Sequence, residues 1–526
     1  MKKILYPCII VIICFGIIDS TMAQDNNIVI IKLDPAKKAQ RIDNIGASGC
    51  WFSEGIGKYW PEEKKERIAE LLFSRQLDKQ GNPRGIGLSA WRFNIGGGTA
   101  EQGDSSGIKD FRKRAECFLA KDGSYNWNKQ LGYQWFLKKA KSYGVEKLIA
   151  FSNMPPVQFT ENGLGYKTVK DYKVNLRSDK FDDYVSFLGE VVKHFDKEGL
   201  HFDYISPVNE PQWDWSKKYM EADQEGSPWA NEDISKVITK LDKELSGSNL
   251  NTAILLPEAG MLNYLYAGSG QASYQIQNFF SPNGQFNASG LQHLPKLVAG
   301  HSYFTDGPDS NRIAVRQHLA DTAAKYGVAF WQSEYCMLAD GFREGTGAPR
   351  TAMDCALFLA KMIHTDFTVA NATAWQYWNS YEPGKADTDT RYYLIALDPN
   401  KTYTDGNFTV TKNLWALGHY SLFVRPGMYR LLVDRSDHSS AYNDAQNLMV
   451  SAFAKDNNEI VVIAINYSNE KKSIKPETKG ISSFKKITAY TTTSAANEDM
   501  KAATVSPAAD RIILEPRSIN TFVLQQ

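Results

Sequence analysis

Short apolar runs that stop on a polar residue recur along the chain. Residues 202–208, Phe-Asp-Tyr-Ile-Ser-Pro-Val, are rich in residues that favour β-strands, and they lead into Glu210 and Pro211. Because proline has no N–H for a sheet ladder, Pro211 predicts that the strand ends beside Glu210. A second run of this kind, residues 328–333, leads into Glu334. The pattern therefore places one carboxylate at the end of each of two buried strands.

Strand-like and helical segments alternate between residues 41 and 425. Amphipathic patterns such as those at 62–74, 184–198 and 234–245 separate the strand-like runs. The predicted strands are residues 42–49, 87–94, 147–152, 202–208, 252–257, 297–303, 328–334 and 372–379. Eight parallel strands with helices between them close into a barrel whose C-terminal rim carries the active site. We therefore predict an α/β fold, a (β/α)8 TIM barrel, over residues 41–425.

The pattern changes after Arg425-Pro426-Gly427, a sequence that ends a helix. Short alternating runs separated by Asn- and Ser-rich turns follow, at residues 448–454, 460–466, 486–492, 511–514 and 520–524. This is typical of antiparallel sheets, so residues 426–526 are predicted to form a C-terminal antiparallel β-sandwich. Within the segment 24–40, residues 28–34 predict one more strand, which precedes the barrel.

The N-terminus is typical of a signal peptide. Lys2 and Lys3 precede an apolar stretch, residues 5–18, and a small-x-small cleavage signal ends at Ala23. We predict removal of residues 1–23 and export of the protein. A surface lipoprotein is the alternative, but Cys14 lacks the small residue expected before a lipidated cysteine. No later segment is long and apolar enough to predict a transmembrane helix.

The charge balance and the aromatic content indicate which classes of partner suit this protein. The chain has 60 basic and 59 acidic residues, and loss of residues 1–23 would remove two lysines and one aspartate, leaving 58 of each. This balance argues against nucleic acid or anionic membranes as partners and favours a neutral substrate. The 12 Trp, 26 Tyr and 26 Phe suit a carbohydrate, because sugar C–H faces pack on aromatic rings.

We predict neither a metal nor a cofactor. Gly96-Gly97-Gly98 lacks the spacing and the lysine of a phosphate-binding loop. The cysteines remaining after cleavage lack the close pairs of a zinc site. Three complete disulfide pairings, or free buried thiols, remain compatible with their positions, which are Cys50, Cys117, Cys336 and Cys355.

Two carboxylates at strand ends suit glycosidic cleavage. The reaction needs a proton donor for the leaving oxygen and a carboxylate facing the oxocarbenium-like carbon. A single glutamate in a barrel is usually not catalytic, but Glu210 and Glu334 each end a buried strand and each lie beside aromatic residues. A sugar-binding protein on an inactive barrel is the alternative from another class. Such a protein would keep its tryptophans and lose one carboxylate, whereas both are present here.

Several motifs in order resemble glycoside hydrolase family 30 of clan A. The matching pieces span roughly residues 40–526 and are specific only together. They are residues 91–94 (WRFN), 152–156 (SNMPP), 206–211 (SPVNEP), 224–226 (QEG), 256–259 (LPEA), 301–303 (HSY), 331–334 (WQSE), 416–419 (ALGH), 425–427 (RPG) and 516–518 (PRS). The resemblance also implies that the strand at 28–34 joins the sandwich.

The resemblance implies roles for individual residues. Glu210 would be the acid/base and Glu334 the nucleophile of a retaining enzyme. Asn209 would bind the hydroxyl beside the scissile carbon, and Arg92 would hold Glu334 in its ionised form. Further residues predicted to bind substrate or support the site are Asn94, Trp51, Trp213, Glu258, His301, Tyr303, Trp375 and Trp378. Val157-Gln158-Phe159 replaces the tryptophan that many related enzymes carry after the Pro-Pro pair.

The substrate is predicted from the resemblance of one segment. Residues 46–60 resemble the branch that includes endo-β-1,6-galactanases. With the neutral charge, this gives endo-acting β-1,6-galactan hydrolysis as the predicted function. Hydrolysis of β-1,6-glucan and an exo-acting β-glycosidase of the same family are the alternatives. The polar segment 382–412 is predicted to border the site as a loop, and the sequence does not choose between endo and exo action. We expect a monomer.

Overall fold

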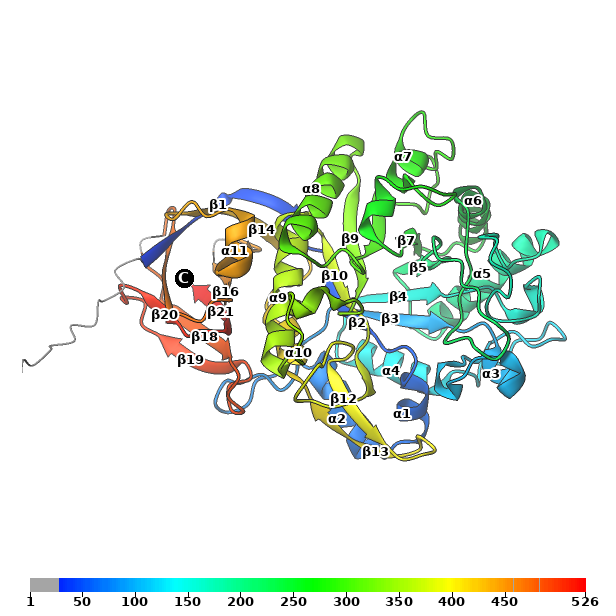
Figure 1. The fold of residues 1–526 in the computed structure, drawn as a ribbon, viewed down its shortest axis with the longest axis horizontal. Coiled ribbons are helices and arrows are strands. Elements are labelled where there is room, and N and C mark those ends of the chain that lie inside the picture. Colours follow the sequence, from blue (N-terminus) through cyan, green and yellow to red (C-terminus); the bar gives the residue numbers. More distant parts are fainter. Residues whose placement is uncertain (1–27, 457, 482) are drawn as a thin grey trace, which may run out of the picture.

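A computed structural model describes residues 28–526 except 457 and 482, so the predicted signal peptide lies outside the described residues. Figure 1 shows a parallel barrel with helices around it, joined to a second body built of strands. The barrel strands run in the order β6-β5-β4-β3-β2-β10-β9-β8-β7. Their bounds are β2 Asn44–Ser48, β3 Ala90–Ile95, β4 Lys147–Ser152, β5 Tyr204–Ser206, β6 Ala253–Ile254, β7 Pro257–Ala259, β8 Leu297–His301, β9 Ala329–Tyr335 and β10 Ala374–Tyr377.

The fifth barrel strand is split into two pieces. β6 pairs with β5, and β7 pairs with β8, so the two pieces together close the ring. Pro257 has no N–H for the ladder, and Glu258 has a left-handed backbone with φ of 53°. Glu258 therefore lies within β7 and not after a strand ending at residue 257. With this strand counted once, the sheet is the predicted eight-position barrel, and the predicted fold class is confirmed.

The helices between the strands cover the outside of the barrel. In α5 (Phe181–Lys197), the buried side chains include Tyr184, Leu188, Val191 and Phe195, which lie three or four residues apart on one face. The other long helices are α2 Glu62–Phe73, α4 Leu131–Ser142, α6 Asn231–Gly247, α8 Asp309–Tyr326, α9 Ala352–Thr368 and α10 Lys412–Ser421. Shorter helices are α1 Ser53–Tyr59, α3 Thr99–Gln102, α7 Gln275–Phe280 and α11 Ala441–Gln446.

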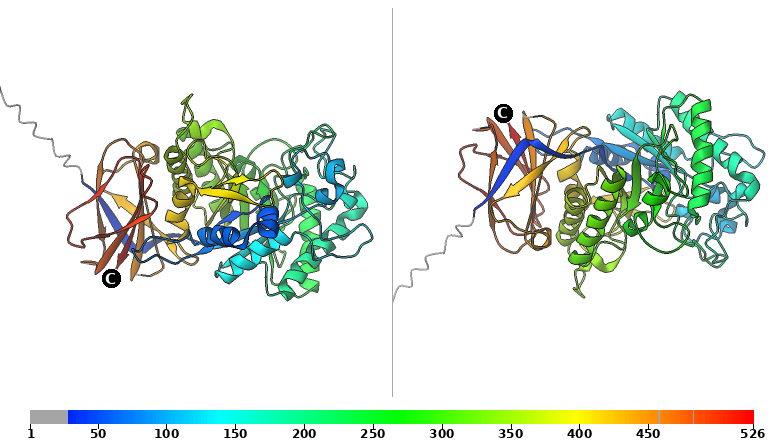
Figure 2. Two further views of the ribbon diagram at one scale, coloured as in Figure 1. Left: turned by 90° about the horizontal axis from the view of Figure 1, so that it is seen from below. Right: turned by 90° about the horizontal axis from the view of Figure 1, so that it is seen from above.

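The second body is a mostly antiparallel sheet in the order β19-β18-β21-β16-β15-β14-β1-β17-β20. Its apolar core combines side chains from strands far apart in that order, such as Ile31, Ile487 and Phe522, so the sheet folds over on itself (Figure 2). The strand bounds are β1 Ile28–Arg41, β14 Tyr429–Arg435, β15 Leu448–Ala454, β16 Glu459–Asn466, β17 Lys472–Thr478, β18 Lys486–Thr492, β19 Lys501–Val505, β20 Ile512–Leu514 and β21 Ser518–Gln525.

The N-terminal strand belongs to this C-terminal sheet. β1 pairs antiparallel with β14 and parallel with β17, so the first and last strands of the described residues belong to one sheet. The hydrophobic pattern of the sequence does not predict β14, β17 or β19. Their side chains are largely polar or half-exposed, and they therefore lack the apolar alternation that marks a half-buried strand.

The segment predicted as a polar loop after the eighth strand is partly ordered into strands. β11 (Tyr381–Pro383), β12 (Ile395–Pro399) and β13 (Gly406–Val410) form a small separate sheet. The cysteines of the described chain, Cys50, Cys117, Cys336 and Cys355, are all buried free thiols. Among the helices in the described ranges, none has the length and apolar character needed to span a membrane.

The two bodies meet through α9 and α10, which pack against β15, β18 and β21. Phe453 of β15 contacts Phe367 and Tyr420 at ring-centroid distances of 5.8 and 6.5 Å. The imidazole of His419 is fully buried between the hydroxyls of Thr521 (2.8 Å) and Thr492 (2.9 Å). Burial lowers the pKa of His419 to about 3, so the ring is neutral in the interface. The contact is apolar with a satisfied polar centre, as in a domain core.

We expect the barrel to be insoluble without the second body. A protein ending after Arg425 would expose the faces of α9 and α10 and leave β1 without β14 or β17. The measurement is the soluble fraction of residues 24–425 after expression. A matched version starting at residue 42 lacks β1. Any insolubility that remains in it is then caused by the exposed helix faces and not by the unpaired β1. If either version is soluble and as active as the full chain, the interface is not required.

Candidate active site

A cavity of about 490 Å³ opens at the C-terminal ends of the barrel strands. It contains both carboxylates singled out in the sequence, Glu210 and Glu334. Other predicted site residues that line it are Trp51, Asn209, Trp213, Tyr303 and Trp378. A volume of this size is typical of a small-molecule site, for which about 300–1,000 Å³ is usual.

Glu210 and Glu334 face each other across this cavity. Glu210 follows β5 with a left-handed backbone, φ 43°, and its N–H donates to the Glu258 carbonyl at 2.9 Å. Trp215 Nε1 donates to the Glu210 carbonyl at 3.1 Å. Glu334 lies in β9, and a carboxylate oxygen of each glutamate lies within 4.8 Å of the other. A strained backbone held by such contacts is common at functional sites.

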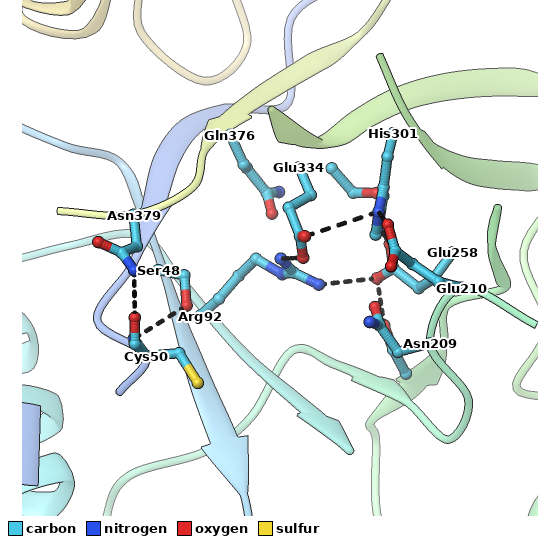
Figure 3. A network of polar contacts seen from close by, with 12 residues as sticks. Ser48, Cys50, Arg92, Asn209, Glu210, Glu258, His301, Glu334, Gln376 and Asn379 are labelled. Atoms are coloured by element: carbon cyan, nitrogen blue, oxygen red, sulfur yellow. Dashed lines mark hydrogen bonds and ion pairs between the residues drawn. The ribbon is translucent and has the colours of Figure 1, made fainter. Parts of the chain in front are cut away.

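The Glu334 carboxylate is held by two donors. Arg92 Nη1 donates to Oε2 at 2.8 Å (Figure 3). The Tyr303 hydroxyl donates to Oε1 at 3.0 Å. The guanidinium of Arg92 is buried and lies 4.2 Å from the centre of the Phe151 ring. Charge-assisted hydrogen bonds of this kind favour the ionised carboxylate. The carboxylate of Glu334 is therefore held in place by a buried cation and a hydroxyl group.

The surroundings of Glu210 raise the pKa of its carboxyl group. Burial raises the pKa of Glu210, the hydrogen bond from His301 lowers it, and the negative charge of Glu334 raises it. The net shift is upward, which favours the protonated form of the carboxyl group. His301 Nδ1 lies 2.9 Å from Glu210 Oε1. The two glutamates thus have different partners: a buried guanidinium and a hydroxyl contact Glu334, and an imidazole contacts Glu210.

Three of the predicted substrate-binding residues, Arg92, Glu258 and His301, do not line the cavity and instead lie behind the two carboxylates. His301 Nε2 lies 3.2 Å from Glu258 Oε2, and Arg92 Nη2 lies 3.5 Å from Glu258 Oε1. Figure 3 shows Arg92 between Glu334 and Glu258. These residues contact the carboxylates and do not face the cavity.

Glu210, His301 and Glu334 also bring three possible metal-ligand atoms within 4.8 Å of one another. A cation there would compete with Arg92 and with a protonated His301 for the same oxygens. These pairs already form at hydrogen-bond distance, so a metal ion would have to displace the cationic groups that contact the carboxylates.

The remaining predicted residues divide between the cavity and the core. Asn209 Nδ2 donates to Asn153 Oδ1, and Asn153 Nδ2 donates to Asn94 Oδ1, each at 3.1 Å, so Asn94 supports the cavity wall from behind. Trp375 is fully buried outside the cavity walls, and its Nε1 donates to Asp366 Oδ2 at 2.8 Å. The prediction that Trp375 contacts substrate is therefore wrong. Both faces of a barrel strand are buried, so the alternation of residues along the strand does not distinguish core residues from site residues.

A family model described as O-glycosyl hydrolase family 30 matches residues 28–391. The chain belongs to this family. An endo-beta-1,6-galactanase of Hypocrea rufa is 24% identical over 372 residues, 67% of each chain. A glucuronoxylanase of Bacillus subtilis is 23% identical over 355 residues, 65% of each chain. The solved structure of a conserved exported protein from Bacteroides fragilis is similar with a TM-score of 0.87 at 34% identity, covering 94% of this chain and 100% of that one.

Many residues that line the cavity of this family 30 protein were not predicted from the sequence. Lys113 places its Nζ 4.7 Å from the centre of the Trp51 ring. Glu382 accepts a hydrogen bond from Asn379 Nδ2 at 2.8 Å, and burial raises the pKa of Glu382. Periodicity could not find them, because loops and short strands carry them. Other lining residues were not named as site residues, although Asn153 and Gln224 lie in the matching motifs; they are Asn153, Trp215, Gln224, Phe304, Cys336, Leu338 and Tyr392.

We expect Tyr303→Phe to reduce kcat by about 10–100-fold, because the variant loses one of the two donors that hold the charged Glu334. The measurement is steady-state hydrolysis of an aryl β-glycoside. Tyr335→Phe is a matched control, since Tyr335 is also fully buried but its hydroxyl bonds to Asp306 at 2.9 Å, away from both glutamates. Equal losses in the two variants would show that the Tyr303 hydroxyl has no special role.

Proposed function

We propose that this family 30 protein is a retaining glycoside hydrolase with Glu210 as acid/base and Glu334 as nucleophile. The observation that carries the proposal is the pair of carboxylates within 4.8 Å of each other in opposite environments. Retaining enzymes hold their carboxyl groups about 5–5.5 Å apart, and inverting enzymes about 6.5–9.5 Å apart to admit a water molecule. The separation supports retention.

The two environments suit the two chemical steps. In the first step, Glu334 attacks the anomeric carbon while Glu210 gives its proton to the leaving oxygen, so the glycosidic bond breaks and a glycosyl ester forms. Ester formation removes the negative charge of Glu334, one of the causes that raises the pKa of Glu210. Glu210 is then a carboxylate that can take a proton from water, and the resulting attack on the anomeric carbon releases the sugar.

We expect the first-formed anomer of the product to keep the β configuration of the substrate. Proton NMR during the first turnovers measures this directly, and an initial α-product from a β-substrate would contradict the assignment.

Glu334→Gln should reduce kcat by at least about 10⁴-fold on every substrate. Glu210→Gln should reduce kcat by about 10²–10⁴-fold when the leaving group needs a proton, and much less for a dinitrophenyl leaving group.

For the substrate, the proposal is a neutral β-linked polysaccharide, and specifically endo-acting cleavage of β-1,6-galactan. The similarity to the endo-beta-1,6-galactanase and the resemblance of residues 46–60 support galactan. Among the cavity-lining residues of the described chain, Lys113 is the one cation, and it stacks on Trp51. A uronic acid would need a more basic pocket. This disfavours a charged xylan.

Two aromatic pairs support cleavage within a chain. Trp51 and Trp378 meet edge to face at 5.1 Å, next to strands β2 and β10. Trp213 and Phe304 meet at 5.9 Å, next to β5 and β8. The strand order places these two pairs of strands on different sides of the barrel mouth. Sugars on both sides of the scissile bond would then each have an aromatic surface, which favours endo action.

The substrate proposal is tested by product analysis on three polymers in parallel: de-arabinosylated arabinogalactan, β-1,6-glucan and glucuronoxylan. We expect a ladder of galacto-oligosaccharides from the first alone. Single galactose units would show exo action, and products from glucan or xylan alone would overturn the galactan assignment. Binding of a polymer without any hydrolysis would instead support a sugar-binding protein on an inactive barrel.

We also propose export after cleavage at Ala23, as predicted from residues 1–23.

A further inference from the structure

One fully buried ion, Glu258, has no part in the two chemical steps. Its Oε1 accepts from the Ser206 hydroxyl at 2.6 Å and faces Arg92 Nη2 at 3.5 Å. Its Oε2 accepts from the Ser333 hydroxyl and faces His301 Nε2 at 3.2 Å. Burial alone would raise the pKa of Glu258, but Arg92 and the hydrogen bonds lower it to about 2. Glu258 is therefore an anion throughout the range in which the enzyme can work.

His301 connects this anion to the proposed acid. Nε2 faces Glu258, and Nδ1 lies 2.9 Å from Glu210 Oε1 and 3.7 Å from Glu334 Oε1. The ring of Tyr303, which follows β8, lies 5.7 Å from the His301 ring, and Arg92 of β3 contacts the same Glu258 and Glu334. Both ring nitrogens meet carboxylate oxygens, and only the doubly protonated ring can donate to both. Burial alone lowers the pKa of His301, but Glu334 and the bonds to Glu210 and Glu258 raise it to about 10.

The protonation of His301 decides where the acidic proton of Glu210 lies. A protonated carboxyl group carries one O–H. When Nδ1 carries a proton, Glu210 Oε1 must accept, so the acidic proton lies on Oε2, the oxygen that His301 does not contact. When Nδ1 is bare, Oε1–H can donate to it instead, and the proton points into the protein and away from a leaving group.

We propose that Glu258 is a positioning residue that keeps His301 doubly protonated and thereby holds the acidic proton of Glu210 on Oε2. The inference rests on the proposed role of Glu210 as acid/base. No proton leaves His301 in either chemical step; only the Glu210 proton moves, to the leaving oxygen and back from water. Glu258 acts on the reaction through His301 and does not touch the sugar.

The direct test is the charge of His301 in the full-length protein, read from its imidazole ¹⁵N chemical shifts at about pH 8. The wild type should show two protonated ring nitrogens, and Glu258→Gln should show a neutral ring. Glu258→Asp keeps the anion and should restore the protonated ring at least in part. A neutral His301 in the wild type would overturn the inference whatever the kinetics show.

The kinetic test compares two leaving groups. Glu258→Gln should lose about 10–100-fold in kcat/KM on an alkyl glycoside, which needs a proton from Glu210, and little on a dinitrophenyl glycoside, which does not. The alkaline limb of the pH profile should move to lower pH, because removing an anion makes the first proton leave the His301–Glu210 pair more easily. Glu258→Asp should recover both properties.

Glu225→Gln is a matched control. Glu225 is also fully buried, but it accepts from Thr99 (2.7 Å) and from the Gly97 N–H, away from His301. Its loss should affect both leaving groups equally and leave the alkaline limb in place. If Glu258→Gln behaves in the same way, Glu258 is only structural and the inference fails. If Glu210→Gln shows no dependence on the leaving group, the proposed function fails instead, and the ¹⁵N result still stands on its own.

Discussion

Charge neutralisation inside the barrel mouth is the constraint on which this site depends. Three carboxylates, Glu210, Glu258 and Glu334, are buried there, and burying an unpaired charge costs several kcal/mol. Two cations alternate with them: Arg92 lies between Glu334 and Glu258, and His301 lies between Glu258 and Glu210. Each cation thus stabilises two acids, and removing any one member would leave its neighbours uncompensated. The same pairing places the two proposed catalytic glutamates in different electrostatic surroundings.

The barrel brings these groups together although they are far apart in the sequence. Arg92 is on β3, Glu258 on β7, His301 on β8 and Glu334 on β9, while Glu210 follows β5. Parallel strands of a barrel all end at the same rim, so residues at their C-terminal ends converge. Arg92 and Glu334 are 242 positions apart and meet at 2.8 Å. Glu210 and Glu258 complete the cluster with left-handed backbones.

Strands and loops contribute different parts of the site. The strands hold the charged cluster, and segments beyond the strand ends supply much of the sugar-facing surface, including Trp51, Trp213, Phe304 and Trp378. The residues lining the cavity fall between Trp51 and Tyr392, so the strand-built body at the C-terminus contributes none of them in the described chain. It covers α9 and α10 instead, and so it supports the barrel from outside the chemistry.

Local patterns in the sequence were sufficient for the barrel and its two glutamates. Each strand is a short apolar run with a clear stop, and each glutamate follows or ends such a run, which needs no knowledge of distant residues. The polar strands β14, β17 and β19 were not predicted from the sequence, because pairing with neighbouring strands stabilises them and they lack apolar alternation. The split at Pro257 was also beyond reach, since each half is defined by a different partner strand.

Only the tertiary structure decided which side chains meet. Sequence could not separate Trp378 in the cavity from Trp375 in the core, because in a barrel both faces of a strand are buried. It could not assign Lys113 to the site or single out Glu382 within the segment 382–412 that was predicted to border it, because both residues lie outside the barrel strands. Nor could it show that His301 touches two carboxylates at once, because that depends on distances between three strand ends. Position along a strand is a local property, whereas protonation depends on the charges that the fold places around a group.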